Sequence, residues 1–194
     1  MLARVLVEAG YPVSIAASGD PVDIALIVDL LAPGASPRWA EDAIAEADIV
    51  ILALPLSRFT DLGPEAFVGK IVVDTMNYWP PTDGIQPIFD HPELGSSEIV
   101  ARHLPGARVV KTLNHIGYHD LADARRPPGD PDRLALMVAA DDPAAAKAVA
   151  EVVEDIGYDA VVLPTLAAGR ILQPGGPYFG AELRRDQIER ELLP

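Results

Sequence analysis

Short apolar runs that end in polar or proline residues alternate along the chain with amphipathic stretches. A continuous apolar run predicts a strand covered on both faces, because a strand with one wet face would alternate apolar and polar residues. The predicted strands lie at 13–17, 49–54, 71–73, 109–110, 134–139 and 160–163. The predicted helices lie at 1–9, 20–31, 40–46, 96–103 and 143–156. This alternation is typical of an α/β fold with a doubly wound, mainly parallel sheet.

Two of the predicted helices begin with the same pair of residues. Asp20-Pro21 and Asp142-Pro143 each place an acceptor side chain at the N-cap and a proline at the first helical position. Gly157 ends the second of these helices just before the strand at 160–163. The residues from 134 to 163 are therefore predicted to form a strand, a helix and a parallel strand with a right-handed crossover.

Two segments lie outside this alternation. Residues 78–95 are rich in Pro, Asp and Gly, and an irregular stretch of that length in a compact domain is typical of a functional loop. Residues 181–194 alternate acidic and basic side chains, with leucine and isoleucine at a helical period. Because 194 residues are too few for two full domains, we assign 1–180 to one domain. We assign 181–194 to a C-terminal helix that packs on this domain or pairs two chains into a homodimer.

Charge and cysteine content exclude several partners and chemistries. A formal net charge of -14, with no cluster of Lys or Arg, argues against a nucleic-acid partner. No apolar run approaches the roughly 18 residues of a membrane-spanning helix, and no signal-peptide pattern is present, so we expect a cytoplasmic protein with no membrane partner. The absence of cysteine excludes disulfides and thiolate ligands, so redox chemistry would need a cofactor. The scarcity of lysine relative to arginine indicates a GC-rich bacterial source.

Polar side chains follow three of the predicted strands at the point where each strand ends. The strand ends are Leu54-Pro55, Asp74-Thr75-Met76-Asn77 and Lys111-Thr112-Leu113-Asn114. Ligands of open parallel sheets bind in the crevice at the carboxyl ends of the strands. These strand ends therefore predict a small-molecule site.

The ordered set of motifs resembles a known family. The motifs are Ala-Leu-Pro at 53–55, Asp-Thr-Met-Asn at 74–77, Val-Lys-Thr-Leu-Asn at 110–114, and a segment at 167–180 that contains Pro-Gly-Gly-Pro-Tyr. They resemble the NADP oxidoreductases that include the NADPH-dependent reductases of coenzyme F420. The resemblance covers most of the chain and implies a Rossmann-like domain that binds NADP and passes a hydride between its nicotinamide and a flavin or deazaflavin. In such enzymes the two ring systems do the chemistry, so no catalytic acid or base is implied.

The resemblance also implies where the ligands lie. The expected cofactor-binding residues are Ser18, Leu54, Pro55, Thr75, Asn77, Thr112 and Asn114. The expected substrate-binding residues are His115, Gly175, Gly176 and Tyr178. Glycines in that segment permit close approach of an acceptor, and a tyrosine ring can stack on it.

Several of these residues have a structural alternative. Ser18 binds the adenosine phosphate or shapes a turn, and Asp20 accepts a ribose hydroxyl or caps a helix. The Thr and Asn side chains at the strand ends bind nicotinamide ribose or form local turns. Lys111 anchors a phosphate or an acidic acceptor, or pairs with a surface carboxylate. The segment 175–178 borders the acceptor or forms a rigid surface turn.

A pair of histidines four residues apart could chelate a metal if both lay on one helical face. Gly117 lies between His115 and His119, and the spacing supplies no third ligand. We therefore expect no metal site, and we favour a place for His115 in the acceptor site.

Two features depart from the family pattern. No GxGxxG turn precedes the helix at 1–9, so the first strand and the main pyrophosphate donors are absent. The stretch 17–20 keeps a serine but lacks the arginine that would grip a 2′-phosphate, which leaves both NADP and NAD open. Either the sequence starts late or the protein no longer binds a dinucleotide tightly. We favour a late start, because a sheet without its central strand would leave two neighbouring strands unpaired.

Three function classes follow from these observations. The first is an NADP(H)-dependent oxidoreductase with a flavin or deazaflavin acceptor, which the strand ends support. The second is a nucleotide-binding sensor without turnover, which the missing glycine turn supports. The third is a structural subunit that pairs with another chain through its C-terminal helix.

Overall fold

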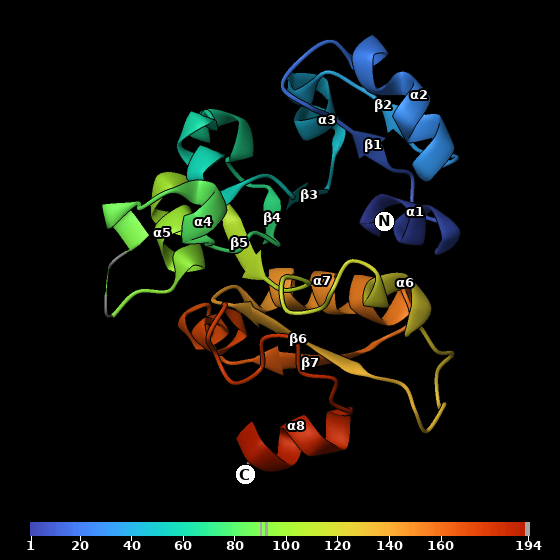
Figure 1. Ribbon diagram of the computed structural model, residues 1–194, viewed down its shortest axis with the longest axis vertical. Coiled ribbons are helices and arrows are strands. Elements are labelled where there is room, and N and C mark those ends of the chain that lie inside the picture. Colours follow the sequence, from blue (N-terminus) through green and yellow to red (C-terminus); the bar gives the residue numbers. More distant parts are fainter. Residues whose placement is uncertain (90, 92, 193–194) are drawn as a thin grey trace.

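The main sheet has five strands in the order β3-β4-β5-β6-β7. The computed structural model describes residues 1–89, 91 and 93–192 (Figure 1). The strands are β3 (Ile49–Leu52), β4 (Ile71–Asp74), β5 (Arg108–Lys111), β6 (Ala135–Ala140) and β7 (Asp159–Leu163). All neighbouring pairs are parallel except β5 and β6, which are antiparallel. The predicted doubly wound, mainly parallel α/β fold is therefore confirmed.

A second, two-stranded parallel sheet lies beside the first and is made of β1 (Ser14–Ile15) and β2 (Ser36–Pro37). In the described part of the chain these two strands pair only with each other. Figure 1 shows them among the N-terminal helices, apart from the five-stranded sheet. The strand expected at 13–17 is thus shorter than predicted, and β2 was not predicted, because a two-residue strand that contains a proline gives no periodic signal.

The helices follow the predicted order closely. They are α1 (Leu2–Glu8), α2 (Pro21–Leu31), α3 (Ala40–Glu46), α4 (Pro80–Asp83), α5 (Ser96–His103), α6 (Asp120–Asp123), α7 (Pro143–Asp155) and α8 (Arg185–Leu192). Short 3₁₀ helices lie at Leu56–Asp61, Pro64–Phe67, Pro87–Phe89 and Ala167–Leu172. The Asp20 carboxylate accepts a hydrogen bond from the Val22 N–H at 2.9 Å. Asp142 accepts from the Ala144 and Ala145 N–H groups at 2.8 and 3.1 Å, so both predicted caps are confirmed.

The expected loop at 78–95 carries more structure than its composition indicates. It contains α4 and the 3₁₀ helix at Pro87–Phe89, while residues 90 and 92 lie outside the described residues. The Asp83 carboxylate accepts hydrogen bonds from the N–H groups of Trp79 and Ser57 at 2.8 and 3.1 Å. These bonds lower the pKa of Asp83 although burial opposes them. The base of the loop is therefore tied to the segment that follows β3.

Helices cover both faces of the main sheet. On one face, α1 and α7 pack against β4, β5 and β6, and Val5, Val138 and Val153 are fully buried there. On the other face, α5 and the segments after β3 pack around Phe59 and Val100. A third cluster covers the outer face of β6 and β7 with α8 and the 3₁₀ helix at Ala167–Leu172. The sheet is thus buried on both faces, as its continuous apolar strands predict.

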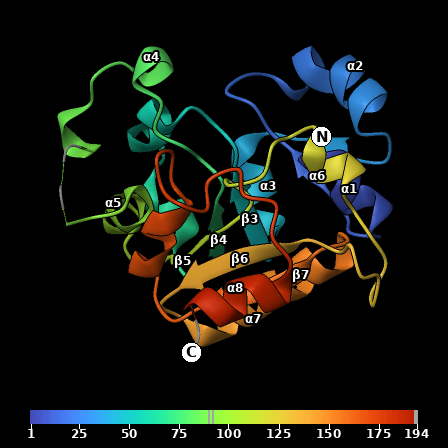
Figure 2. The same ribbon diagram turned by 60° about the horizontal axis from the view of Figure 1, so that its bottom comes forward.

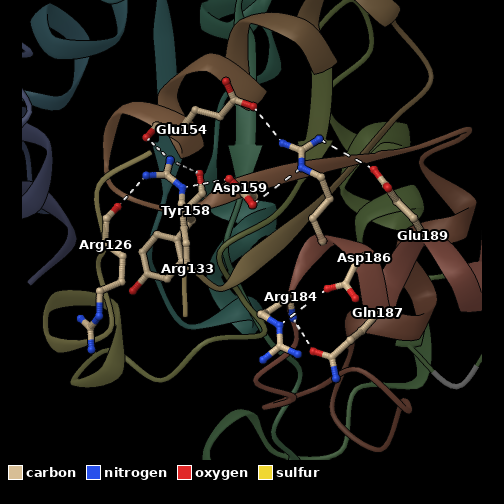
Figure 3. A network of polar contacts seen from close by, with 10 residues as sticks. Arg126, Arg133, Glu154, Tyr158, Asp159, Arg184, Asp186, Gln187 and Glu189 are labelled. Carbon is tan, nitrogen blue, oxygen red and sulfur yellow. Dashed lines mark hydrogen bonds and ion pairs between the residues drawn. The ribbon is translucent and has the colours of Figure 1, made fainter. Parts of the chain in front are cut away.

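The C-terminal helix α8 is held on the domain. Ile188 is fully buried among residues of β6 and β7, and Figure 2 shows α8 lying across these two strands. The Arg185 guanidinium lies 3.1 Å from Glu154 Oε1 and 3.8 Å from Asp159 Oδ2. Behind this pair, the buried Arg133 guanidinium bonds to Asp159 Oδ1 at 2.9 Å and to the Tyr158 carbonyl at 2.7 Å (Figure 3). The apolar side of α8 is therefore covered within one chain.

No helix in the described part of the chain is both long enough and apolar enough to span a membrane.

Candidate functional site

The ends of β3, β4 and β5 meet at one edge of the main sheet. In the parallel register, Leu52 lies beside Asp74, and Asp74 lies beside Lys111. The residues that follow these three positions therefore leave the sheet at the same height. This edge is where an open parallel sheet binds its ligand.

Hydrogen bonds join the three strand ends. The Thr75 hydroxyl donates to the Leu52 carbonyl at 2.9 Å. The Asn77 amide donates to the Asn114 carbonyl at 2.8 Å, and the Asn114 amide donates to Asn77 Oδ1 at 3.0 Å and to the Leu172 carbonyl at 2.7 Å. Thr75, Asn77 and Asn114, which the sequence names as candidates, are thus brought together.

Two buried polar atoms at this edge lack a hydrogen-bond partner among the described residues. They are Thr112 Oγ1 and Asn114 Oδ1, and both belong to the segment that follows β5. A buried polar atom without a partner carries a desolvation cost, so such atoms are rare in folded proteins and mark places where a water or ligand completes the bonding. Both atoms lie beneath the surface of the edge, where an internal water would complete their bonding, while the partly exposed Thr75 and Asn77 present polar groups to the crevice.

Between Thr112 and Asn114, Leu113 adopts a left-handed backbone with φ of 63°. This conformation costs a non-glycine residue roughly 1 kcal/mol and is held in place by its surroundings. Leu113 is 7% exposed and packs in the core beside α7. Its unusual backbone redirects the chain at the strand end, so that Asn114 meets Asn77.

A buried ion pair lies beneath the strand ends. Lys111 Nζ is 3.4 Å from Asp74 Oδ2, and neither side chain is exposed. Asp74 also accepts from the Ser97 hydroxyl at 2.6 Å and from the Met76 N–H at 2.8 Å, while Lys111 donates to the Met76 carbonyl. Burial lowers the pKa of Lys111, and the neighbouring Asp74 opposes this shift. Of the alternatives for Lys111, the structure thus gives it a carboxylate partner, but a buried one.

Sequence reasoning missed two residues of this cluster. Asp74 was seen as part of a motif but not as the partner of Lys111, although both follow apolar strands at equivalent points. Gly169 was not singled out, yet a Cβ atom there would lie 3.2 Å from Lys111 Cβ and 3.1 Å from Ala139 Cβ. The glycine lets the 3₁₀ helix at Ala167–Leu172 pack directly on the ends of β5 and β6.

His115 lies inside the protein. Its Nε2 atom accepts a hydrogen bond from the Met137 N–H of β6 at 3.2 Å, and its side chain is buried. Burial, helped by the nearby Lys111 charge, lowers the pKa of His115 to about 3. Its Nδ1 atom has no partner among the described residues, and the adjoining cavity of about 30 Å³ has room for one water. His115 is therefore a neutral residue that contacts β6.

The two histidines do not share a helical face, because residues 115–119 form turns. His119 is exposed and its ring lies 4.1 Å from that of Tyr118. Within the described residues, no group of three His, Cys, Asp or Glu side chains could hold a metal ion.

The segment at 175–180 places its aromatic residues on opposite sides. Tyr178 is 8% exposed, packs in the cluster beneath α8 and donates its hydroxyl proton to Glu191 at 2.8 Å. Phe179, which the sequence did not single out, instead makes an edge contact with Trp79 at 5.7 Å between ring centroids. At Gly176 a Cβ atom would lie 2.4 Å from the Ile171 carbonyl, so the turn requires glycine. Gly175 is exposed on the same turn.

Ser18 lies in a hollow of about 510 Å³ at the end of β1. Trp39, Glu41 and Asp42 line the same hollow, and no Lys or Arg among the described residues lines it. Trp39 is 52% exposed and offers an aromatic face for a planar ring. A phosphate group would meet two carboxylates here, so the hollow fits an adenosine better than a 2′-phosphate.

The remaining candidates lie near these two places. Asp20, which borders the hollow, is the N-cap of α2. Leu54 is partly buried and Pro55 exposed at the end of β3.

Comparison with known proteins agrees with this arrangement. Residues 1–78 match the family model of NADP oxidoreductase, coenzyme F420-dependent. A hypothetical protein from Sinorhizobium meliloti is 31% identical, with a TM-score of 0.81 over 95% of this chain and 89% of that one. A protein of an Arthrobacter species described as an F420-dependent NADP reductase is 26% identical, with a TM-score of 0.72 over 87% of this chain and 81% of that one.

More distant structures share the fold alone. The 3-hydroxyisobutyrate dehydrogenase of Mycobacterium tuberculosis is 22% identical, with a TM-score of 0.56, and this chain covers 52% of it. No curated protein matches the sequence. The resemblance of the chain to the coenzyme F420-dependent NADP oxidoreductases is therefore confirmed, by the family model over residues 1–78 and by the Arthrobacter structure over 87% of the chain.

Proposed function

We propose that the chain is a nicotinamide-dinucleotide oxidoreductase whose hydride partner is a flavin or a deazaflavin of the coenzyme F420 type. The family and the Arthrobacter structure support NADP-dependent redox chemistry. The observation that carries the proposal is the hydrogen-bonded group of polar side chains at the carboxyl edge of the parallel sheet, in which Thr75 and Asn77 are partly exposed and Asn114 lies behind them.

The strand ends would hold the nicotinamide half of the cofactor. Thr75, Asn77, Thr112 and Asn114 offer hydroxyl and amide groups for a ribose and a carboxamide, while Leu54 and Pro55 would contact it through shape. When bound, the dinucleotide supplies a hydride that carries two electrons to the acceptor ring. The chain's own part is to orient the ring and exclude water, because no acid or base is needed for that transfer.

The hollow around Ser18 and Trp39 would receive the adenosine half. Its acidic lining favours a ribose hydroxyl over a 2′-phosphate, so we propose that the chain accepts NADH at least as well as NADPH. Substituting Ser18→Arg should raise NADPH affinity about tenfold and leave NADH affinity unchanged, since a guanidinium forms a charge-assisted fork with phosphate. A matched control is Val68→Arg, which adds the same charge in the exposed turn that precedes β4.

The acceptor would lie against the turn that contains Gly175 and Gly176. Gly175 is exposed, and the neighbouring Trp79 and Phe179 present aromatic edges that suit a planar tricyclic ring. His115 and Tyr178, named from the sequence for this role, have buried side chains that bond to β6 and to Glu191 of α8, and the His115 carbonyl meets the turn by accepting from the Gly180 N–H at 2.9 Å. The acceptor pocket is therefore proposed between Trp79, just before α4, and the 175–180 turn.

A titration of the 194-residue chain with NADH and NADPH, followed by nicotinamide fluorescence, tests the proposal. We expect saturation at micromolar concentrations and, with coenzyme F420 or FMN added, oxidation of the nicotinamide. Binding without turnover with either acceptor would favour the sensor alternative. Absence of saturation below millimolar with both dinucleotides would contradict the proposal.

Thr112→Val separates binding from folding. Removing a buried hydroxyl that has no hydrogen-bond partner among the described residues should leave the melting temperature unchanged or raise it slightly. If the hydroxyl contacts the cofactor, dinucleotide affinity should fall about tenfold, which corresponds to about 1.4 kcal/mol. Thr60→Val, at an exposed position of the 3₁₀ helix Leu56–Asp61, is the matched control and should change neither quantity.

A further inference from the structure

Helix α2 turns its apolar side toward solvent. Val22, Leu26 and Leu30 are 77%, 81% and 75% exposed. Because they are spaced four residues apart, they form one stripe along the helix. Ile27 and Leu31, 55% and 54% exposed, widen the stripe, and we call these five residues the α2 stripe.

The rest of the described chain leaves the α2 stripe uncovered. The helix packs on β2 through its other side, where Val28 is its one buried residue. Figures 1 and 2 both show α2 at the periphery of the molecule, at the opposite end from α8. A contiguous exposed apolar patch on a protein of charge -14 marks an interaction surface rather than a solvated face.

The stripe is self-complementary. Val22 and Leu30 lie four residues on either side of Leu26, so a twofold axis at Leu26 would set Leu26 against its copy and Val22 against Leu30 of that copy. A twofold interface of this kind uses the same patch on both subunits. The two helices would run antiparallel, which also places the positive end of each helix beside the negative end of the other.

The available area suits a pair of chains. With about 180 Å² for a fully exposed aliphatic residue, the stripe offers on the order of 600 Å² per copy, and two copies would bury about 1,200 Å². That value is at the lower bound of specific protein interfaces. Asp23 and Asp29 lie on the same helix close to the stripe, so the centre of the contact would be apolar and its margin acidic.

We propose that the α2 stripe is a homodimer interface, with α2 of one chain packed antiparallel on α2 of a second copy. The interface is separate from the C-terminal helix, whose apolar side is already covered by its own chain. The association is driven by apolar burial against electrostatic repulsion between two acidic copies. Rising salt should therefore strengthen it, the reverse of a contact built on ion pairs.

Sedimentation of the full chain gives the first test. The wild type should be dimeric at tens of micromolar, and Leu26→Glu should weaken the dimer at least a hundredfold while the melting temperature of the monomer is unchanged. Ile85→Glu is the matched control, because Ile85 is 87% exposed on the 78–95 loop and should leave the dimer intact. A wild type that stays monomeric at 100 µM in both low and high salt overturns the proposal.

Because the chain has no cysteine, a single introduced one gives a second test. Leu26→Cys should form a disulfide-linked dimer under mild oxidation at least ten times faster than Ile85→Cys, since the twofold axis brings the two sulfurs together. Equal rates for the two variants would show that α2 does not meet its copy and would overturn the proposal even if the wild type were dimeric.

Discussion

The helices α2 and α8 lie at opposite ends of the molecule and have opposite relations to the core. In α8 the apolar residue Ile188 is fully buried and Arg185 pairs with carboxylates of α7 and β7. In α2 the most apolar residues face solvent, and Leu26 is 81% exposed. Helical periodicity therefore shows which residues share a face, but only tertiary packing decides whether the same chain covers that face.

The two helices differ in burial because they pack on different sheets. α8 packs on β6 and β7, which are five or more residues long and belong to the main sheet. α2 packs on β2, which has two residues and a single neighbour. A short strand pair offers little apolar surface, so a helix placed there keeps one side for another partner.

The largest expected effect is a loss of folding stability at low pH, and it arises at the end of the molecule that carries α8. His115, which bonds to β6 beside the cluster under α8, has its pKa lowered from 6.5 to about 3 by burial. Between pH 6.5 and 3, His115 is therefore protonated in the unfolded chain and neutral in the folded chain. The stability this group contributes is complete above pH 6.5 and is lost as the pH falls toward 3, by about 1.4 kcal/mol per pH unit. Urea unfolding of the wild type and of His115→Gln at pH 7, 6 and 5 measures it. If both proteins lose stability equally over this range, His115 is not the neutral buried group described.

Truncation of one residue on each helix comes next in size. Ile188→Ala should cost about 3 kcal/mol of unfolding free energy, because it removes buried methyl groups and leaves a cavity. Leu26→Ala, measured at concentrations where the chain is monomeric, should change the unfolding free energy by less than about 0.5 kcal/mol. Chemical denaturation of the two variants checks this directly. Comparable losses would mean that α2 is as well packed as α8 and would remove the contrast.

The ion pairs of α8 should contribute least. Arg185→Ala removes contacts to Glu154 and Asp159, but all three side chains are partly exposed, so the loss should be below about 1 kcal/mol. Thermal unfolding at low and high salt measures it, and the difference from wild type should shrink as salt rises. A loss near that of Ile188→Ala would show that charge rather than apolar burial holds α8.

The local parts of the fold could be predicted from the sequence because their causes are local. The caps Asp20 and Asp142, the apolar strands, and the strand ends that carry Thr75 and Asn114 all depend on near neighbours in the chain. The family resemblance rests on motifs of this local kind, and the family model confirms it over residues 1–78, which contain the first two of them. The fold class, and the grouping of Thr75, Asn77 and Asn114 at one edge of the sheet, could be predicted from these local signals.

The remaining features depend on contacts between distant segments. Tyr178 packs inward with residues of β6, β7 and α8 and donates its hydroxyl proton to Glu191, contacts that no spacing in the sequence predicts. Asp74 and Lys111 become partners only once β4 and β5 lie in register. Leu26 is exposed because β1 and β2 offer little apolar surface to α2. The apolar pattern of the sequence does not predict how short these two strands are.

The short strands of the two-stranded sheet also affect which part of the protein unfolds locally in solution. β1 and β2 share only the rungs Ser14 with Ser36 and Ile15 with Pro37, and a proline brings no backbone N–H to the ladder. Within the described residues, no strand hydrogen bonds join this pair to β3. The region from 11 to 47 should therefore open as a cooperative unit below the global unfolding free energy, so that its amide hydrogens exchange before those of β4 and β5. Residues 11–47 would then open and close while the strand ends of the main sheet stay closed.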